Sequence, residues 1–204
     1  VAHEVALMGG RSIACLNARD RNVLGFQRDL LTAAAYGVDE FLFVYGDRPE
    51  TGRRSDDLTV RSMIDEARRF GANAALAPKP FRIGVSSALR PLPSWKDDAD
   101  FLFVQVSFAF EDLLRWRDTV DFRGPIFAGV MAPPSASMAR KLSAQIPQLA
   151  VPESLIEALE SSRNAGVDFA CGMVDQVRNS GAFDGIHLIP VSRYREIASR
   201  LEQS

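Results

Sequence analysis

Charged residues gather directly after an apolar run near the start of the chain. The segment 17–22 reads Asn-Ala-Arg-Asp-Arg-Asn and opens a helical pattern. Asp20 or Asn22 can cap the new helix by accepting hydrogen bonds from its free N–H groups. Arg19 and Arg21 instead add positive charge to a helix N-terminus that is already positive, and an anion is the natural complement. The segment therefore predicts a phosphate- or carboxylate-binding turn, with simple capping as the alternative.

A second charged group follows the apolar run 41–45, where residues 46–49 read Gly-Asp-Arg-Pro. Gly-Asp is common in ordinary turns, so a purely structural turn is one interpretation. In a parallel α/β protein, however, the residues after a strand lie at the carboxyl rim of the sheet, where ligands bind. The spacing places Asp47 at this rim, but from these residues alone the structural turn is the favoured interpretation.

Gln105 comes at the end of the apolar run 101–104. Its amide carries two donors and an acceptor, which must find partners if the side chain is buried. A hydrogen bond to a neighbouring strand is one outcome, and contact with a ligand is the other. From these residues alone both interpretations stay open.

Apolar, β-branched and aromatic runs alternate with helical periodicity along the whole chain, which indicates repeated βα units around a parallel sheet. The residues 1–204 are expected to form one domain, because no linker or internal repeat interrupts the pattern. Strands are predicted at 12–17, 39–45, 81–87, 100–106, 125–131 and 184–190. Helices are predicted from the apolar spacing within 23–33 and 58–67, and over 109–120, 134–145, 151–163, 166–180 and 192–202.

Composition excludes several classes of function. A net charge of −2 and a pI near 5.8 give no basic field for nucleic acid, and no apolar run reaches the roughly 20 residues that span a bilayer. Cys15 and Cys171 lie far apart, as expected for core thiols in a reducing compartment, and no metal-ligand cluster is evident. With no export signal at the start, a cytoplasmic protein is expected.

The order and spacing of these motifs resemble the methylenetetrahydrofolate reductase family, flavin-dependent (βα)8-barrel enzymes of one-carbon metabolism. Residues 15–22 are similar to the family's His-Leu-Thr-Cys-Arg-Asp-Arg-Asn, and 98–105 to its Ala-Gly-Ala-Asp-Phe…Thr-Gln. Segments 129–133, 151–153 and 185–193 resemble its Gly-Ile-Leu-Pro, Val-Pro-Glu and Gly-x-His…Leu-Asn-Arg. The likeness covers essentially the whole chain, in order.

The resemblance implies an α/β fold of the (βα)8, or TIM-barrel, type. Six strands are evident where the barrel needs eight. Aligned to the family, the chain starts in the helix after the second strand, so the first one to two βα units, about 60 residues, are absent from this sequence. A homo-oligomer, or a partner chain that supplies the missing strands, is then expected.

The resemblance also implies roles for particular residues. Asp47 and Gln105 are the expected catalytic residues: the first steadies positive charge as the folate ring opens, and the second reads the edge of the pterin or nicotinamide. Gln105 and Arg193 are expected to bind substrate, while His187 is interpreted as a core histidine. The expected cofactor-binding residues are Cys15, Asn17, Arg19, Asp20, Gly46 and Lys96.

The implied reaction is reduction of 5,10-methylenetetrahydrofolate to 5-methyltetrahydrofolate by NADH or NADPH through a bound FAD. Departures from the family pattern at Cys15, Ala88 and Lys96 bring in two alternatives. The first is a divergent folate reductase with lost or altered flavin binding. The second is a non-catalytic folate-binding or partner subunit.

Overall fold

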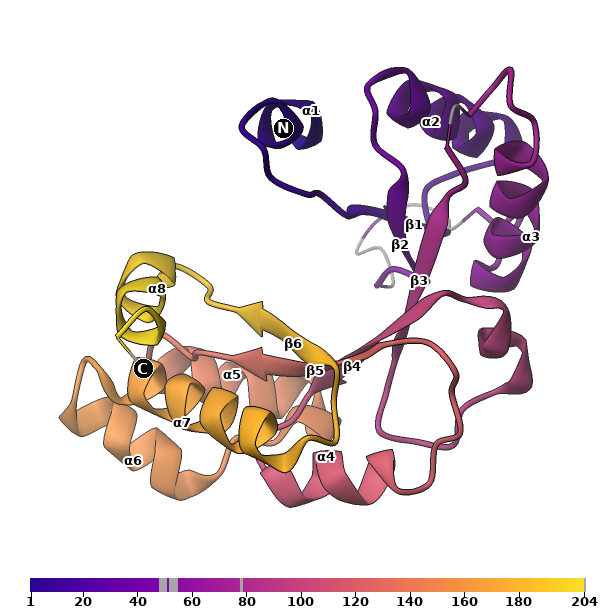
Figure 1. Ribbon diagram of the computed structural model, residues 1–204. Helices are drawn as coiled ribbons and strands as arrows, with labels where there is room; N and C mark the ends of the chain where they lie inside the picture. Colours follow the sequence, from indigo (N-terminus) through magenta and orange to yellow (C-terminus); the bar gives the residue numbers. More distant parts are fainter. Residues whose placement is uncertain (48–50, 52–54, 78, 204) are drawn as a thin grey trace. The chain divides into compact units, whose positions relative to one another are not determined.

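The computed structural model describes residues 1–47, 51, 55–77 and 79–203, in which six strands alternate with helices (Figure 1). The α/β class predicted from the sequence is confirmed. The strands are β1 (Ala14–Asn17), β2 (Glu40–Val44), β3 (Arg82–Ser87), β4 (Phe101–Val106), β5 (Ile126–Met131) and β6 (Gly185–Ile189). The α-helices are α1 (Ala2–Leu7), α2 (Val23–Ala35), α3 (Val60–Gly71), α4 (Phe110–Arg117), α5 (Ala136–Gln145), α6 (Glu153–Ser161), α7 (Ala165–Ser180) and α8 (Tyr194–Leu201). Two short 3₁₀ turns, η1 (Ser94–Asp98) and η2 (Pro147–Leu149), complete the elements.

Contacts divide the described chain into two compact units, the first made of residues 1–86 and 92–102 and the second of residues 87–91 and 103–204. In the first unit β1, β2 and β3 pair in parallel, with Cys15 opposite Leu42 and Leu42 opposite Gly84. Helices α2 and α3 flank these strands (Figure 1). Phe26 of α2 meets Phe43 of β2 edge to face, with ring centroids 5.4 Å apart.

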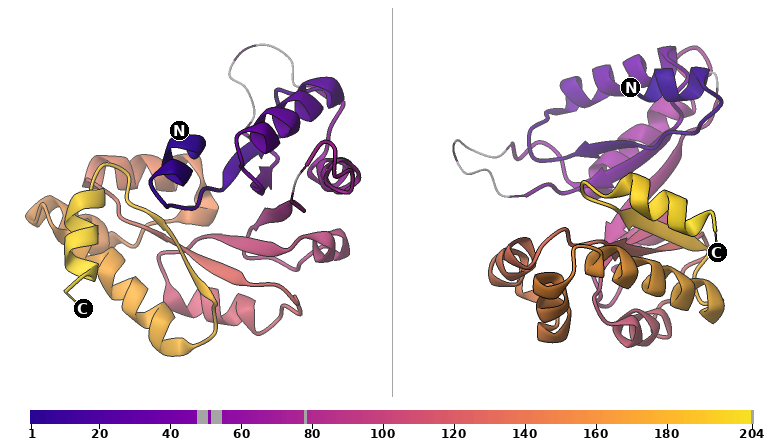
Figure 2. Two further views of the ribbon diagram at one scale, coloured as in Figure 1. Left: turned by 45° about the horizontal axis from the view of Figure 1, so that its top comes forward. Right: turned by 90° about the vertical axis from the view of Figure 1, so that its left-hand side faces the viewer.

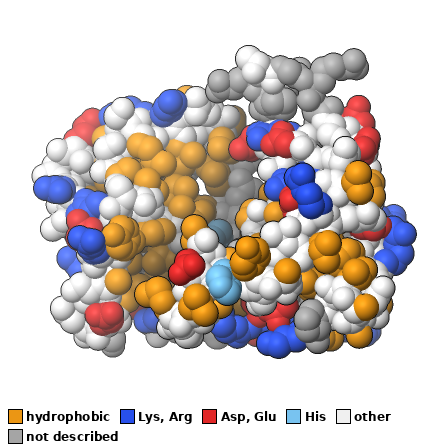
Figure 3. Space-filling view, turned by 90° about the horizontal axis from the view of Figure 1, so that it is seen from above, with side chains coloured by type: hydrophobic (Ala, Val, Ile, Leu, Met, Phe, Trp, Pro, Cys, Tyr) orange, Lys and Arg blue, Asp and Glu red, His pale blue; other side chains and the backbone are white. Residues whose placement is uncertain are grey.

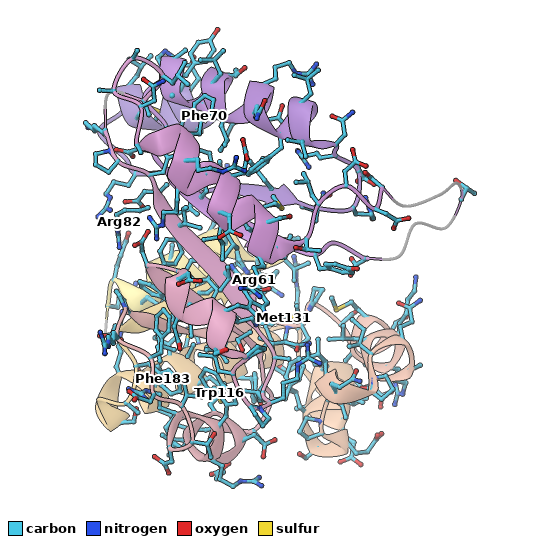
Figure 4. All side chains as sticks on the ribbon, turned by 90° about the vertical axis from the view of Figure 1, so that its right-hand side faces the viewer. Arg61, Phe70, Arg82, Trp116, Met131 and Phe183 are labelled. Atoms are coloured by element: carbon cyan, nitrogen blue, oxygen red, sulfur yellow. The ribbon has the colours of Figure 1, made fainter. Side chains whose placement is uncertain are left out.

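Aromatic and charged side chains close the amino-terminal ends of the first unit's strands. Phe70 of α3, which Figure 4 labels, stacks on Phe81, with ring centroids 6.1 Å apart and an interplanar angle of 11°. Arg82 donates to Glu40 at 3.0 Å, and Arg11 also bonds the Glu40 carboxylate. Glu40 is buried, so these two guanidinium groups supply the partners that a buried carboxylate requires.

The second unit contains the later part of β4, then β5 and β6, with Phe127 of β5 opposite Gly185 of β6 in a parallel pair. Helix α7 contacts both β5 and β6, and α4 lies on the same side of the strands (Figures 1 and 2). Val104, Ala128 and Val130 are almost fully buried. Alternate residues therefore divide between a helix-covered face and a second face that carries Phe103, Gln105 and Phe127.

An aspartate clamps two neighbouring strands together in each unit. Asp100, directly before β4, accepts a hydrogen bond from the N–H of Ile83 at 2.7 Å and donates its own N–H to the Ile83 carbonyl at 2.7 Å. Asp184, directly before β6, makes the same two bonds to Ile126 of β5, at 2.8 Å and 3.0 Å. The side chain of each aspartate thus satisfies an amide at the start of the neighbouring strand, that of the second residue in β3 and of the first in β5.

Two strands are less buried than the others. Among the described residues, β1 is the outermost strand of the first unit and pairs with β2. β6 is the outermost strand of the second unit and pairs with β5. All five residues of β6 are partly exposed, whereas four of the five residues of β2 are buried. No helix in the described part of the chain is long and apolar enough to cross a membrane. Acidic and basic side chains are interspersed on the face shown in Figure 3.

Helix α7 contains two glycines for which substitution by alanine is expected to change stability in opposite directions. A Cβ added to Gly166 would lie 2.0 Å from the backbone carbonyl oxygen of Pro133, whereas one added to Gly172 would meet nothing within 4 Å. Gly166→Ala is therefore expected to lower the free energy of unfolding by at least about 1–3 kcal/mol, because backbone must move. Gly172→Ala should raise it by up to about 1 kcal/mol, since alanine favours a helix. Chemical denaturation of both variants measures the difference. Equal stabilities would contradict the close packing of α7 on residue 133.

Candidate functional site

The turn between β1 and α2 holds an internal ion pair. Arg19 donates from Nε and Nη2 to the two carboxylate oxygens of Asp20, both at 2.7 Å, and from Nη1 to the carbonyl oxygen of Asp47 at 3.1 Å. The bond to Asp20 raises the pKa of the Arg19 guanidinium. Asn17 accepts from the N–H of Asp20 at 3.2 Å. Four of the predicted site residues therefore meet here.

The second arginine of this turn is also engaged. Arg21 donates to Asp29 of α2 at 2.8 Å and to the carbonyl oxygen of Asn17 at 3.2 Å. Asn22 caps α2 by accepting from the N–H of Gly25 at 2.7 Å. The capping interpretation is confirmed for Asn22. Anion binding by the turn stays a prediction, because both arginines have partners within the protein.

Gly46 brings the end of β2 against this turn. Its φ of +82° is the left-handed conformation, and a Cβ would lie 3.0 Å from the Cβ of Arg19 and 3.2 Å from that of Asn17. Glycine is therefore required both by the backbone and by the close approach. The next residue, Asp47, is exposed, and within the described part of the chain its carboxylate accepts no hydrogen bond. The predicted Arg48 and Pro49 lie outside the described residues.

Cys15 is exposed on β1, so the expectation of a core thiol is wrong for this residue, while Cys171 is buried as expected. The difference arises because β1 is the outermost strand of its unit and its second residue faces outward. Partial desolvation raises the pKa of the Cys15 thiol, and the charge of Arg21 offsets part of this effect. The thiol is therefore protonated at neutral pH.

Lys96 lies buried in η1, next to the carboxyl end of β3. Its Nζ donates to the carbonyl oxygen of Ser86 at 2.7 Å and lies 5.5 Å from the centroid of the Trp95 ring. The carboxyl ends of β1, β2 and β3 lie at the same edge because the strands are parallel. This edge gathers six of the predicted residues from one unit, namely Asn17, Arg19, Asp20, Gly46, Asp47 and Lys96. Cys15 of the same unit lies two residues before the end of β1, opposite Leu42.

The two remaining predicted residues lie in the second unit. Gln105 is partly buried on β4, and its amide has no hydrogen-bond partner among the described residues. Arg193 follows β6 and donates to Glu196 at 2.9 Å, to the carbonyl oxygen of Arg163 at 2.7 Å and to Asn164 at 3.1 Å. All three guanidinium nitrogens of Arg193 therefore hold α8 to the start of α7, and substrate binding by this residue stays a prediction.

His187 was expected to be a core histidine, but it is partly exposed on β6. It lies opposite Gly129 in the register of β5 and β6 and stacks on Phe103, with centroids 4.6 Å apart. Burial lowers the pKa of its imidazole. The alternation of residues 103, 105, 127, 129 and 187 along three strands was the available signal. The described residues hold no group of three or more His, Cys, Asp or Glu arranged to bind a metal ion.

Comparison with solved structures gives distant matches. Tryptophan synthase from M. tuberculosis is 17% identical with a TM-score of 0.38, over 87% of this chain and 66% of that one. Oxaloacetate acetylhydrolase is 12% identical with a TM-score of 0.49, over 99% and 62%. Phosphonopyruvate hydrolase is 15% identical with a TM-score of 0.38, over 94% and 69%. The chain thus spans less than two thirds of the length of the first two structures.

The sequence comparisons are more specific. No curated protein matches the chain. The family model of methylenetetrahydrofolate reductase matches residues 6–204, so the match begins within α1 and runs through both units to the last residue. That span includes every predicted site residue, from Cys15 on β1 to Arg193 before α8. The chain therefore belongs to the methylenetetrahydrofolate reductase family.

Proposed function

We propose that this protein reduces 5,10-methylenetetrahydrofolate to 5-methyltetrahydrofolate at the expense of NADH or NADPH, with a flavin as the intermediate carrier. Family membership supports an oxidoreductase that acts on a folate. The observation that carries the proposal furthest is the exposed carboxylate of Asp47. It lies at the carboxyl end of β2, against the β1–α2 turn, and has no hydrogen-bond partner in the described part of the chain.

A carboxylate in this position suits the chemistry of the substrate. When the five-membered ring of methylenetetrahydrofolate opens, its methylene carbon becomes part of an iminium cation, which then accepts a hydride. A fixed negative charge stabilises the cation before the hydride arrives, and it is most effective when no internal cation neutralises it. Asp47 meets this requirement in part: Arg19 hydrogen-bonds the Asp20 carboxylate and the backbone carbonyl of Asp47, and it acts on the Asp47 carboxylate only through electrostatic attraction.

The residues present fit a flavin incompletely. The basic side chains expected at its diphosphate are Arg19 and Lys96, and each is committed within the protein: Arg19 to Asp20, and Lys96 to the Ser86 carbonyl. Arg21, the other cation of the turn, bonds Asp29. A diphosphate would have to displace these partners. The positions expected at the ring end, Gly46 and Asp47, place no such internal ion pair in the way.

The engaged cations favour one second candidate, a folate reductase of this family that takes hydride directly from a nicotinamide. The absorption spectrum of the purified protein distinguishes the two. The main proposal predicts flavin bands in the blue and near ultraviolet that remain with the protein after gel filtration. A colourless protein that still oxidises NAD(P)H in the presence of methylenetetrahydrofolate would support the second candidate. A colourless protein that binds folate without turnover would support a non-catalytic subunit.

We also propose that residues 1–204 form part of a single (βα)8 barrel in the cytoplasm. The first one to two βα units would lie outside this sequence, and a further segment of polypeptide, a second copy of the chain or a partner chain would supply them. The partly exposed strands β1 and β6 support this proposal, because each lies at the open side of its unit. Closure of a barrel removes such strand edges.

A further inference from the structure

The second unit presents two polar side chains on the strand face that points away from the helices. Ile186 and Leu188 of β6 line one cavity together with residues of α7, so the intervening His187 points to the opposite face of the strand. Gln105 of β4 shares that face, since its neighbours Val104 and Val106 are buried. Both Gln105 and His187 are partly exposed, and neither side chain has a hydrogen-bond partner among the described residues.

Gly129 lies between these two side chains. It is opposite His187 in the β5–β6 register, and an added Cβ would lie 2.4 Å from the Val104 carbonyl oxygen and 2.9 Å from the Gln105 carbonyl carbon. Glycine is therefore required for the close approach of β5 to β4. It also leaves no side chain standing between Gln105 and His187.

The ring contact shows that His187 reaches across this gap. Strands two apart are separated by about 9.6 Å, twice the usual spacing of about 4.8 Å. The centroids of His187 on β6 and Phe103 on β4 are nevertheless 4.6 Å apart, with an interplanar angle of 24°. Both side chains must lean over β5, and Gly129 provides the space. The imidazole thus lies beside the strand position that carries Gln105, two residues after Phe103.

The chemistry of the two groups is complementary to a planar heterocycle. The Gln105 amide offers donors and an acceptor, and a neutral imidazole offers one of each. Burial lowers the pKa of His187, which keeps the ring neutral at physiological pH. Phe103 holds the imidazole plane, and Phe127 packs edge to face on Phe103 at 5.3 Å, so the histidine has an aromatic support.

We propose that His187 is a second ring-positioning residue beside Gln105, and that it hydrogen-bonds the polar edge of the flat heterocycle that Gln105 receives. This inference rests on the proposed function, and it assigns to His187 a role that the core interpretation denied it. Two ligands share the required chemistry: the pterin of a folate and the carboxamide-bearing ring of a nicotinamide. The proposed contact surface lies on β4, β5 and β6, with Gly129 between Gln105 and His187.

The test measures binding affinity by isothermal titration calorimetry of the full-length protein. One arm uses 5-methyltetrahydrofolate as the probe and the other uses NADH. His187→Phe keeps a ring to stack on Phe103 but removes both nitrogens. It should weaken binding of at least one probe by about 2- to 12-fold, the fold-change that corresponds to about 0.5–1.5 kcal/mol for one hydrogen bond. His187→Gln should recover part of the loss. The arm that is affected identifies the ring.

Histidine supplies a second readout, because the chain contains two histidines and the other, His3, lies in α1. The Hε1 proton resonance of His187 is assigned by its loss in the His187→Phe variant and should move when the probe binds. His3→Phe is the matched control and should leave both affinities unchanged. Melting temperatures of both variants report whether packing has changed.

The outcomes separate this inference from the proposed function. If Gln105→Ala weakens binding but His187→Phe does not, and the His187 resonance stays in place, the role of His187 is overturned while the folate function stands. If the unsubstituted protein binds neither probe, the proposed function fails, and the inference fails with it. If His187→Phe weakens binding and His187→Gln recovers none of it, the nitrogen contact is overturned.

Discussion

Asp47→Asn is expected to slow reduction of 5,10-methylenetetrahydrofolate by about 10²- to 10³-fold. The substitution preserves the shape of the side chain and removes its charge, and one preorganised group that stabilises transition-state charge contributes about 2.7–4 kcal/mol. Flavin retention should change little, because the Asp47 contact with Arg19 is made by the backbone carbonyl. Rapid-reaction measurement of the folate step, in the protein with any residues that precede Val1, gives the rate.

A control at the other end of the same strand separates this effect from a loss of fold. Asp39 directly precedes β2 and its carboxylate lies 3.9 Å from Lys79, at the amino-terminal edge of the strands. Asp39→Asn makes the same change of charge and should leave the rate of folate reduction within a factor of about two. An unchanged rate in Asp47→Asn would remove Asp47 from the mechanism. Equal losses in both variants would point to stability instead.

Supplying the two barrel strands that we propose to lie outside this sequence is expected to have the second large effect. The 204-residue polypeptide alone should aggregate or lack turnover, because β1 and β6 expose strand edges that can pair with other molecules. Addition of about 60 preceding residues, the length of two βα units, should restore a monodisperse and active protein. A partner polypeptide that contributes two strands should do the same. Light scattering and folate-dependent NAD(P)H oxidation measure the two properties.

One result would contradict both the barrel proposal and its reasoning. A 204-residue monomer that is monodisperse, melts cooperatively and turns over folate would need no further strands. A useful control extends the chain by an unrelated, soluble segment of equal length. This control should leave aggregation unchanged, because it offers no strands that match the edges of β1 and β6.

The secondary structure was largely predictable from the sequence. All six strands were found within two residues of their ends, because each combines β-branched and aromatic residues with a clear break before the next helix. Helix α7 was predicted at 166–180 and spans Ala165–Ser180. The turn η1 was not predicted, since its polar sequence Ser-Trp-Lys-Asp-Asp has no apolar period to read. Lys96 is nevertheless buried there and donates a hydrogen bond to the Ser86 carbonyl, a contact that the sequence does not reveal.

The location of the candidate site was predictable, but the ion pairs between its arginines and aspartates were not. The residues after β1 and β2 meet as expected, because adjacent parallel strands end at one edge. Which acid each arginine takes was not predictable: Arg19 pairs with the adjacent Asp20, while Arg21 reaches eight residues along to Asp29. The second choice depends on the direction in which α2 leaves the turn, because Asp29 lies on that helix. His187 was misjudged because a strand histidine is buried or exposed according to which face of the strand it occupies.

The two aspartate clamps bear on the order in which the chain can fold. Asp100 fixes its strand against Ile83, and Asp184 fixes its strand against Ile126, each within its own unit. A slip of one residue would separate the carboxylate from its amide and turn every side chain of that strand to the other face. Each strand pair therefore carries its own alignment signal. One pair can find its register before the rest of the chain has been synthesised, and an error in one unit need not spread to the other.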